Sequence, residues 1–412
     1  MFNTIMLRKT RKSIVFMILS LVLVLSVVLS QAALAVNAPG DKGINFSGYA
    51  FVSGNQNYNL KVFLDKNCAS CLDAGYFKVH DMTDNDDKTV TLYGTSSDKP
   101  TSASWYPTGT CALLKISGLE ANHEYRVTVS NSVYANNGFT LGQMAKNKDC
   151  VFYFEAPDSN GAYTLTPRVT VYPSDGTSNL AWEGNALFTT NRPMQIDPDN
   201  LGYFKKYYNS AWQDNLDQTF DANAVTNAYG YLRQVMDIPN TWYYPETTSG
   251  TSGGVSYNLN NANDNGAAVN FRLQLPYLKP VVGGSYTNYN PAAGYYAFST
   301  NAYDIPAKLA KPTVATGANS GEITVTVTKG TSSNYPIATE YNFYVCSDKY
   351  FFDGTATLTN GTPYSNSSSS FNYTITGLTP GANYYVVVAP VISSGFGEGG
   401  YSPASVQVQA HS

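Results

Sequence analysis

The side chains that most often carry catalysis are few in this chain and lie far apart. Among 412 residues there are three histidines, His80, His123 and His411. A Ser-His-Asp triad needs a histidine that contacts a nucleophile and is oriented by a carboxylate, and no short motif supports one here. The sequence also lacks HExxH, a P-loop and a G-x-G-x-x-G turn. We therefore expect no catalytic residue and no enzymatic activity.

The densest acidic stretch runs from His80 to Asp87. Oxygen ligands at short spacing suit calcium, so Asp84, Asp86 and Asp87 are the calcium candidates. The stretch does not follow the EF-hand spacing, and Asp and Asn are preferred turn residues. We expect a solvated hairpin turn without metal or cofactor, with bound calcium as the alternative.

Four of the five cysteines, Cys68, Cys71, Cys111 and Cys150, fall in the first third of the chain. In an exported protein this grouping predicts two disulfides, whose connectivity the sequence leaves open. Half of a zinc site is the alternative for the first two, but the other two are not paired at a zinc-ligand spacing. Cys346 stands alone in a strand-like run, which favours a buried small hydrophobe over an intermolecular bridge.

Residues 1–35 are typical of a secretory signal peptide. Basic residues occupy positions 8, 9, 11 and 12, an apolar run extends over 14–29, and Ala33-Leu34-Ala35 supplies a small-x-small cleavage site. An uncleaved membrane anchor is the alternative, and the cleavage site argues against it. We predict an exported mature chain that starts at Val36, is extracellular or on the cell surface, and does not contact the membrane after cleavage.

Composition excludes one large class of partner. Charged residues make up only 13% of the chain, against about 25% in typical soluble domains. The net charge is −4 and there is no basic stripe, so we expect no nucleic-acid partner. The 33 tyrosines suit surfaces that make protein contacts at low entropic cost.

Short, alternating apolar runs separated by Gly, Asn, Asp and Pro predict an all-β fold. We expect three modules after the signal peptide, at residues 36–157, 158–305 and 306–412, with an insertion at about 200–254. Part of the insertion, residues 222–236, has helical character. The insertion also carries contact aromatics that could stack on sugars, bind protein or form a core: Trp212, Trp242, Tyr243 and Tyr244.

The stretch Gly377-Leu378-Thr379-Pro380-Gly381, followed by Tyr384 and a β-branched run, resembles the corner of fibronectin type III domains. A weaker version occurs at residues 118–125 and ends at Tyr125. The resemblance implies a sandwich of about 100 residues in which the tyrosine bonds back to the upstream loop. The core tryptophan of the family is replaced by Val327.

The first two modules resemble bacterial immunoglobulin-like domains of surface proteins. The resemblance rests on the Phe152-Tyr153-Phe154 strand, on residues 169–177 with their P-x-x-G turn, and on residues 186–194, which end in Pro-Met. Together the two resemblances imply three tandem β-sandwiches, a fold that carries no catalytic residue with it.

These observations predict a non-enzymatic structural or adhesive protein of the cell surface, and a subunit of a self-assembling filament or surface layer is the specific form that we expect. Its partners are then other copies of itself or other surface proteins. Phe46 and Tyr49 are candidate donor-strand residues that would anchor the mature N-terminus in a neighbouring copy; the alternative is that they form the first strand of their own module. The rival function is a polysaccharide-binding accessory protein or the non-catalytic part of a secreted glycosidase system.

Overall fold

The computed structural model describes residues 44–52, 54–98, 109–172, 174, 176, 178, 185–196, 200, 203–208, 211–213, 233–237, 241–245, 254–258, 270–280, 288–292, 294–299, 306–330 and 336–412. For 185–187, 195–196, 203–206, 208, 211–213, 233–258 and 271, only backbone is described within these ranges. The expected signal peptide lies outside them. Every sheet is antiparallel, which confirms the prediction of an all-β protein built from sandwiches.

The first module is a sandwich of two four-stranded sheets, ordered β1-β2-β6-β5 and β4-β3-β7-β8. This is the strand arrangement of immunoglobulin-like domains. Apolar side chains alternate inward from both sheets, as two facing sheets require. Its elements are β1 (Phe46–Phe51), β2 (Leu60–Leu64), η1 (Ala74–Tyr76), β3 (Phe77–Asp81), β4 (Asp86–Lys88), β5 (Val90–Ser96), β6 (Thr110–Ile116), β7 (Glu124–Val129), α2 (Leu141–Ala145) and β8 (Cys150–Glu155).

The two candidate donor-strand residues lie in the core of this module. Phe46 and Tyr49 belong to β1, which pairs with β2 of the same chain. Their rings stack on Phe152 with centroids 5.2 and 4.5 Å apart, and both side chains are buried. Removing them to another copy would open this core, so the structure has the alternative arrangement, in which they form the first strand of their own module.

The second module places β9, β10 and β14 in one sheet and β12, β13, β17 and β19 in another. The expected insertion thus supplies strands β12, β13 and β14 to the sheets of the module. The helical expectation is wrong at its C-terminal end, because residues 233–236 extend alongside β10 as part of β14, and sheet pairing outweighs local propensity there. The strands are β9 (Val169–Tyr172), β10 (Asn185–Thr190), β11 (Met194–Ile196), β12 (Tyr203–Tyr208), β13 (Ala211–Gln213), β14 (Arg233–Asp237), β15 (Thr241–Pro245), β16 (Gly254–Asn258), β17 (Asn270–Gln274), β18 (Leu278–Pro280) and β19 (Tyr296–Ser299).

The third module faces a three-stranded sheet, β20-β21-β25, with a larger sheet centred on β22 and β26. Ile323, Val325 and Val327 alternate inward from β21 and pack in one core with Phe343 and Val388. The strands are β20 (Thr313–Thr316), β21 (Ile323–Thr328), β22 (Glu340–Cys346), β23 (Thr357–Leu358), β24 (Tyr364–Ser365), β25 (Ser370–Ile375), β26 (Asn383–Ile392), β27 (Gly397–Glu398) and β28 (Val408–Gln409).

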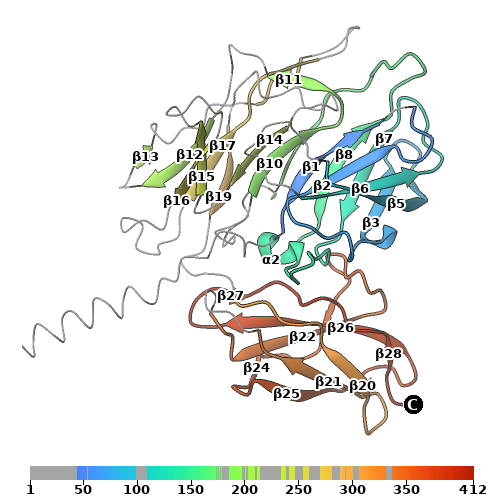
Figure 1. The fold of residues 1–412 in the computed structure, drawn as a ribbon, viewed down its shortest axis with the longest axis vertical. Coiled ribbons are helices and arrows are strands. Elements are labelled where there is room, and N and C mark those ends of the chain that lie inside the picture. The colour runs from blue at the N-terminus through green and yellow to red at the C-terminus, as the bar shows by residue number, and fades with distance from the viewer. Residues whose placement is uncertain are drawn as a thin grey trace, which may run out of the picture.

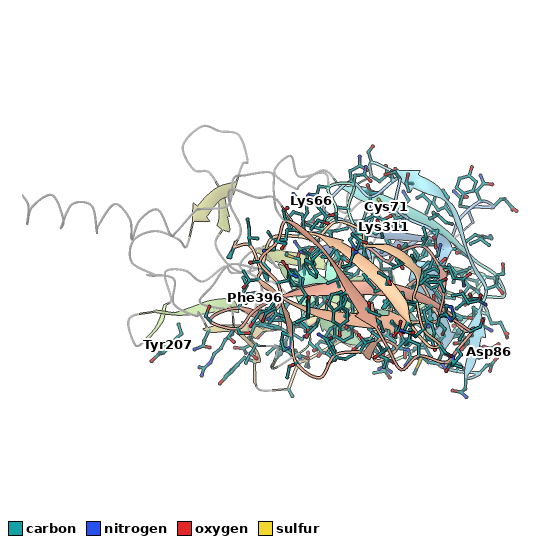
Figure 2. All side chains as sticks on the ribbon, turned by 90° about the horizontal axis from the view of Figure 1, so that it is seen from below. Lys66, Cys71, Asp86, Tyr207, Lys311 and Phe396 are labelled. Carbon is teal, nitrogen blue, oxygen red and sulfur yellow. The ribbon has the colours of Figure 1, made fainter. Side chains whose placement is uncertain are left out.

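The three modules are not spaced along a line. In Figure 1 the second module lies beside the first, and the third lies below both, with α2 at the boundary between the first and third. Seen from below in Figure 2, Asp86 of the first module and Tyr207 of the second lie at opposite sides, and the third module crosses the middle. Within the described ranges, no helix has the length and apolarity to span a membrane.

Candidate functional site

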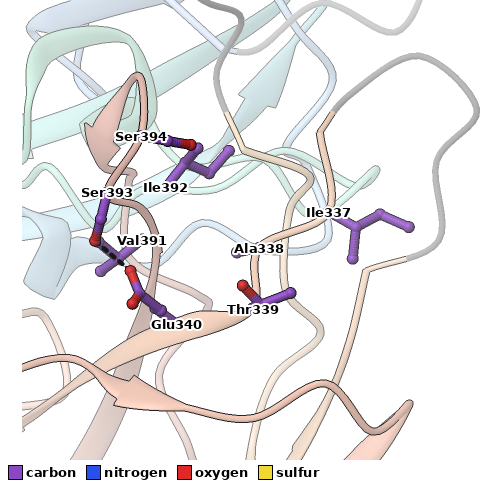
Figure 3. A pocket seen from close by; sticks show the side chains of 8 residues that line it. All are labelled: Ile337, Ala338, Thr339, Glu340, Val391, Ile392, Ser393 and Ser394. Atoms are coloured by element: carbon purple, nitrogen blue, oxygen red, sulfur yellow. Dashed lines mark hydrogen bonds between the residues drawn. The ribbon is translucent and has the colours of Figure 1, made fainter.

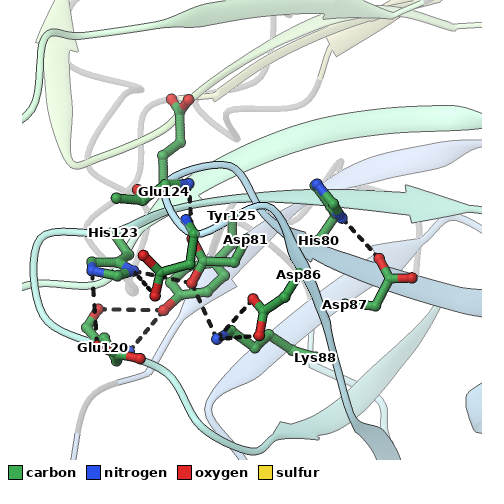
Figure 4. Close-up of polar contacts among 11 residues, drawn as sticks. His80, Asp81, Asp86, Asp87, Lys88, Glu120, His123, Glu124 and Tyr125 are labelled. Atoms are coloured by element: carbon green, nitrogen blue, oxygen red, sulfur yellow. Dashed lines mark hydrogen bonds and ion pairs between the residues drawn. The ribbon is translucent and has the colours of Figure 1, made fainter.

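The acidic stretch around Asp81 forms a polar cluster with His123 and Lys88 on the first module (Figure 4). Asp81 is fully buried at the end of β3. One of its carboxylate oxygens accepts from the N–H groups of Thr83 and Asp84, at 2.9 and 3.2 Å. The other lies 3.0 Å from Nδ1 of His123 and 3.2 Å from Nζ of Lys88. Asp81 therefore joins β3, β4 and the turn before β7.

The protonation states of this cluster suit a structural ion pair. Burial opposes the ionisation of Asp81, but hydrogen bonds from His123, Lys88 and two backbone N–H groups outweigh it and hold its pKa well below the usual range. The hydrogen bond to Asp81 in turn raises the pKa of His123, against the effect of burial. A carboxylate held ionised by a positive partner is a poor proton acceptor, so the cluster does not fit general acid–base chemistry.

The same cluster is where a metal could be considered, since ligand atoms of Asp81, Asp84 and His123 lie within 4.8 Å of one another. However, Lys88 and His123 already neutralise the Asp81 carboxylate, and a cation would have to displace them. The other two calcium candidates point to different partners: Asp86 pairs with Lys88 at 3.0 Å and Asp87 lies 2.8 Å from His80. The three predicted aspartates are therefore not brought together as a calcium site.

The two corner tyrosines make the local bonds that the fibronectin type III resemblance implies. The Tyr384 hydroxyl accepts from the N–H of Thr379 at 3.2 Å. In the first module the Tyr125 hydroxyl accepts from the N–H of Glu120 at 2.7 Å and donates to its carbonyl at 3.4 Å. Tyr125 is completely buried, so its corner is the more enclosed of the two.

All five cysteines are free thiols in the structure. Burial raises the pKa of Cys68 and Cys111 to about 12, and it also raises the pKa of Cys150 well above its usual range. Thiols with raised pKa values in apolar surroundings are slow to react. Cys71 is half-buried beside Asn136, and Cys346 is buried, as a small hydrophobe would be. The two disulfides stay a prediction for the exported protein.

The aromatic residues of the expected insertion are placed by backbone only. Trp212 lies on β13 opposite Tyr207, and Trp242, Tyr243 and Tyr244 follow one another on β15, which pairs with β16. Their side chains lie outside what the structure describes. Sugar stacking, protein contact and core packing stay alternative predictions for them.

The largest unexpected site is the contact between the first and third modules. Residues of α2 and of the loop before it contact the loop between β22 and β23 and the turn between β26 and β27. Phe139 and Met144 form one buried cluster with Ala307 and Phe396. Tyr350 packs edge-on against Tyr76 of η1, with ring centroids 4.9 Å apart.

Polar bonds across this contact end mostly on main-chain groups. Asn131 donates to the carbonyl of Phe351 at 3.1 Å, and Thr140 donates to that of Tyr401 at 3.0 Å. Three more bonds follow the same pattern: Ser130 and Ser132 both donate to the carbonyl of Tyr350, and the N–H of Asp353 donates to Asp149 at 2.8 Å. At the rim, Lys349 pairs with Asp73 at 2.8 Å and Lys148 with Asp353 at 3.0 Å.

Two glycines allow the modules to approach this closely. A Cβ atom at Gly400 would lie 2.5 Å from the backbone N and Cα of Gln143 in α2, and one at Gly75 would lie 1.9 Å from the ring of Tyr350. Phe351 itself has a left-handed backbone, with φ of 44°, which is costly for a bulky residue. Such a conformation persists only where its surroundings fix it, and here Asn131 and the buried ring do so.

The contact between the first and second modules is of another kind. Strand β10 packs against both β1 and β8, and Tyr172 of β9 joins the core of the first module, edge-on to Phe46. Arg168 pairs with Glu124 at 2.9 Å, and the Asn191 side chain donates to the same carboxylate at 3.0 Å. The Tyr49 hydroxyl donates to the carbonyl of Thr190.

A shallow pocket of about 330 Å³ lies in the third module, between the start of β22 and the end of β26 (Figure 3). Ile337, which is 50% exposed, forms one wall, and Val391 and Ile392 form the other. The Ser393 hydroxyl donates to Glu340 across it. This bond leaves the one acidic group of the pocket already engaged, so the pocket does not assemble a reactive centre.

Among known proteins the chain has only distant structural similarity. No family model matches the chain, and no curated protein matches it. Among solved structures, domains A168–A170 of titin are similar at 10% identity and a TM-score of 0.23, covering 90% of this chain and 100% of that one. Domains FN1–FN3 of chicken CNTN1 are similar at 11% identity and a TM-score of 0.21, covering 90% and 98%. Likeness at this level does not bear on function.

Proposed function

We infer that this protein is a non-enzymatic structural or adhesive component of the cell surface, exported and able to assemble with copies of itself into a filament or layer. The observation that carries the proposal is the docking of the third module on the first. Buried rings, main-chain hydrogen bonds and two close-approach glycines fix the angle between modules that the chain separates by the whole second module. A fixed shape is what a repeating assembly needs from its subunit.

The chemistry of the described residues supports the same role. The polar clusters pair their charges internally, as the Asp81–His123–Lys88 and Glu124–Arg168 groups do. Catalytic groups are instead poised by pKa shifts toward the working pH and face a cleft.

Carbohydrate binding is the second candidate. It is favoured by three partly exposed tyrosines of the second module, Tyr207, Tyr277 and Tyr295, at 39, 36 and 44%. Sugar rings stack on exposed aromatic faces, although Arg272 already lies 4.0 Å over the Tyr295 ring.

Negative-stain microscopy and polysaccharide affinity gels on the purified mature protein separate the two candidates. We expect polymers or sheets and no shift in the gels. A monomer that is retarded by a polysaccharide would instead establish the second candidate, and a monomer that is not retarded would leave neither standing.

A further inference from the structure

Edge strands decide where a β-sandwich can join another, because they carry backbone N–H and C=O groups without a ladder partner. The sheets of the first and third modules end in ten described edge strands. Most are closed or blunted. Strand β10 covers β1 and β8, β20 is bridged to β28 by a bond from Thr316 to the carbonyl of Gln409 at 3.0 Å, and β23, β24, β27 and β28 are two residues long.

Strand β4, another edge of the first module, is protected from pairing in a different way. It is three residues long, and all three are charged. Charged side chains on a short edge strand disfavour pairing with another chain. Two edges remain, one in each module.

The first open edge is β5 of the first module. It has seven residues and no charge, and its exposed positions are Thr91, Tyr93 and Thr95. Among the described residues, only β6 pairs with it. A bulge between Leu92 and Gly94 leaves Tyr93 as the extra residue, 57% exposed. Bulges re-aim side chains at sheet edges, and an aromatic side chain beside the edge is a good anchor for an incoming strand.

The second open edge is β25 of the third module. It has six residues and no charge, and its register with β21 is unbroken from Ser370 to Ile375. Ser370, Asn372 and Thr374 are exposed. Among the described residues, no backbone group other than those of β21 bonds to it. This is the more regular of the two edges.

We propose that β5 of one copy pairs with β25 of the next, so that a sheet continues from the first module of one subunit into the third module of its neighbour. This inference rests on the proposed function and names the surface through which copies associate. Two different edges on one subunit make a head-to-tail contact, which propagates into an open chain when the rotation does not close a ring. The docked modules hold the two edges at a constant relative orientation, as a regular chain requires.

The test uses one lysine on each edge of the full mature chain. Thr95→Lys places a charge on β5, and Thr374→Lys places one on β25. The matched control is Thr328→Lys, at an exposed position of β21, which is an inner strand of the same sheet and not an edge strand. Each edge variant should raise the protein concentration needed for assembly about tenfold or more, the fold-change for about 1.4 kcal/mol, whereas the control should assemble as the unaltered protein does. Circular dichroism melts check that all three fold.

Mixing the edge variants gives the deciding result. Thr95→Lys keeps a working β25, and Thr374→Lys keeps a working β5, so an equimolar mixture should form one-to-one dimers by light scattering and go no further. Assembly that survives in both edge variants would overturn the proposed contact while leaving a self-assembling protein. Assembly lost in one variant alone would overturn it in favour of a two-fold contact. An unaltered protein that stays monomeric would disprove the proposed function as a self-assembling protein.

Discussion

The first module meets its two neighbours in opposite ways. Against the second module it uses strands and core side chains. Strand β10 packs across β1 and β8, and Tyr172 packs edge-on against Phe46 in the hydrophobic core of the first module. Against the third module it uses loops, with side chains such as Asn131 and Thr140 donating to main-chain carbonyls. The first contact resembles the inside of a domain, and the second resembles an interface between two proteins.

The difference follows from chain connectivity. The second module continues directly from β8, so its first strands reach the open side of the first sandwich with little loop-closure entropy to overcome. The third module begins only at residue 306, after the whole second module, and meets the first module through its loops. A finished sandwich offers its loops, whose backbone groups are free to bond, and glycines at which backbones can touch. The two contacts should therefore fail by different mechanisms.

The largest expected effect is on the loop contact. Gly400→Ala places a Cβ atom 2.5 Å from the backbone of α2. Because the clash is with backbone atoms, rotating a side chain cannot relieve it, and the third module has to shift. We expect a cost of about 3 kcal/mol, seen as faster hydrogen exchange in residues 130–149 and a larger radius of gyration in X-ray scattering. Gly361→Ala is the control, because a Cβ atom there meets nothing within 4 Å. Equal behaviour of the two variants would mean that the modules are not docked in solution.

The strand contact should respond most to loss of its buried carboxylate. Glu124 is 12% exposed and accepts from both Arg168 and Asn191. Glu124→Gln removes the charge that both donors share, at about 2 kcal/mol. Because this contact is part of a core, the loss should appear as a lower melting temperature without separation of the modules. Glu120→Gln, at a position 59% exposed, should be near neutral. A scattering change in Glu124→Gln would show that this contact opens like the other.

Substitution of the corner tyrosines tests the stability of each module itself, separately from the contacts between modules. Each loses only a hydroxyl bond when changed to phenylalanine, at about 1 kcal/mol. Tyr125→Phe should cost more than Tyr384→Phe, because Tyr125 is fully buried and bonds twice to Glu120. Thermal melts of the full chain, with the exposed Tyr93→Phe as control, check the order. The reverse order would remove the corner assignment from the first module.

The smallest effect is a dependence of the loop contact on pH. Burial lowers the pKa of Lys146 to about 8, where its amino group lies 3.7 Å from the Phe396 ring. Docking therefore favours the neutral amine. As the pH rises from about 8 toward the usual lysine pKa of about 10.4, docking should strengthen, and below 8 this contribution should be flat. Hydrogen exchange in residues 130–149, compared between the unaltered chain and Lys146→Met, measures the slope. An equal slope in the two proteins would assign it to another group.

Local patterns in the sequence were enough to predict much of the third module. The alternation at Ile323–Val327 and the corner before Tyr384 are set by neighbouring residues, and both take the expected secondary structure. The all-β class follows for the same reason. Only part of the polar cluster could be predicted. The acidic turn is evident in the sequence, whereas the central role of Asp81 depends on contacts with Lys88 and His123 from other elements.

The loop contact had no signal that a sequence could show. It joins residues about 220 apart through main-chain carbonyls, which every residue has, and through glycines such as Gly75, which look like ordinary turn residues. The helical expectation fails at residues 233–236 for a related cause, because these residues become a strand only through pairing with β10. Tertiary partners decided both outcomes.

The docked loops also change the path that tension takes through the molecule. A pull between β1 and the C-terminus, which lies in the third module (Figure 1), passes from the first module straight to the third and bypasses the second. The loop contact then breaks first. The force passes through the second module from that point, and the molecule lengthens before any sandwich unfolds. Optical-tweezer extension of the full chain should show this as an early, low-force step that Gly400→Ala removes. A first step of equal force in that variant would place the weak point elsewhere.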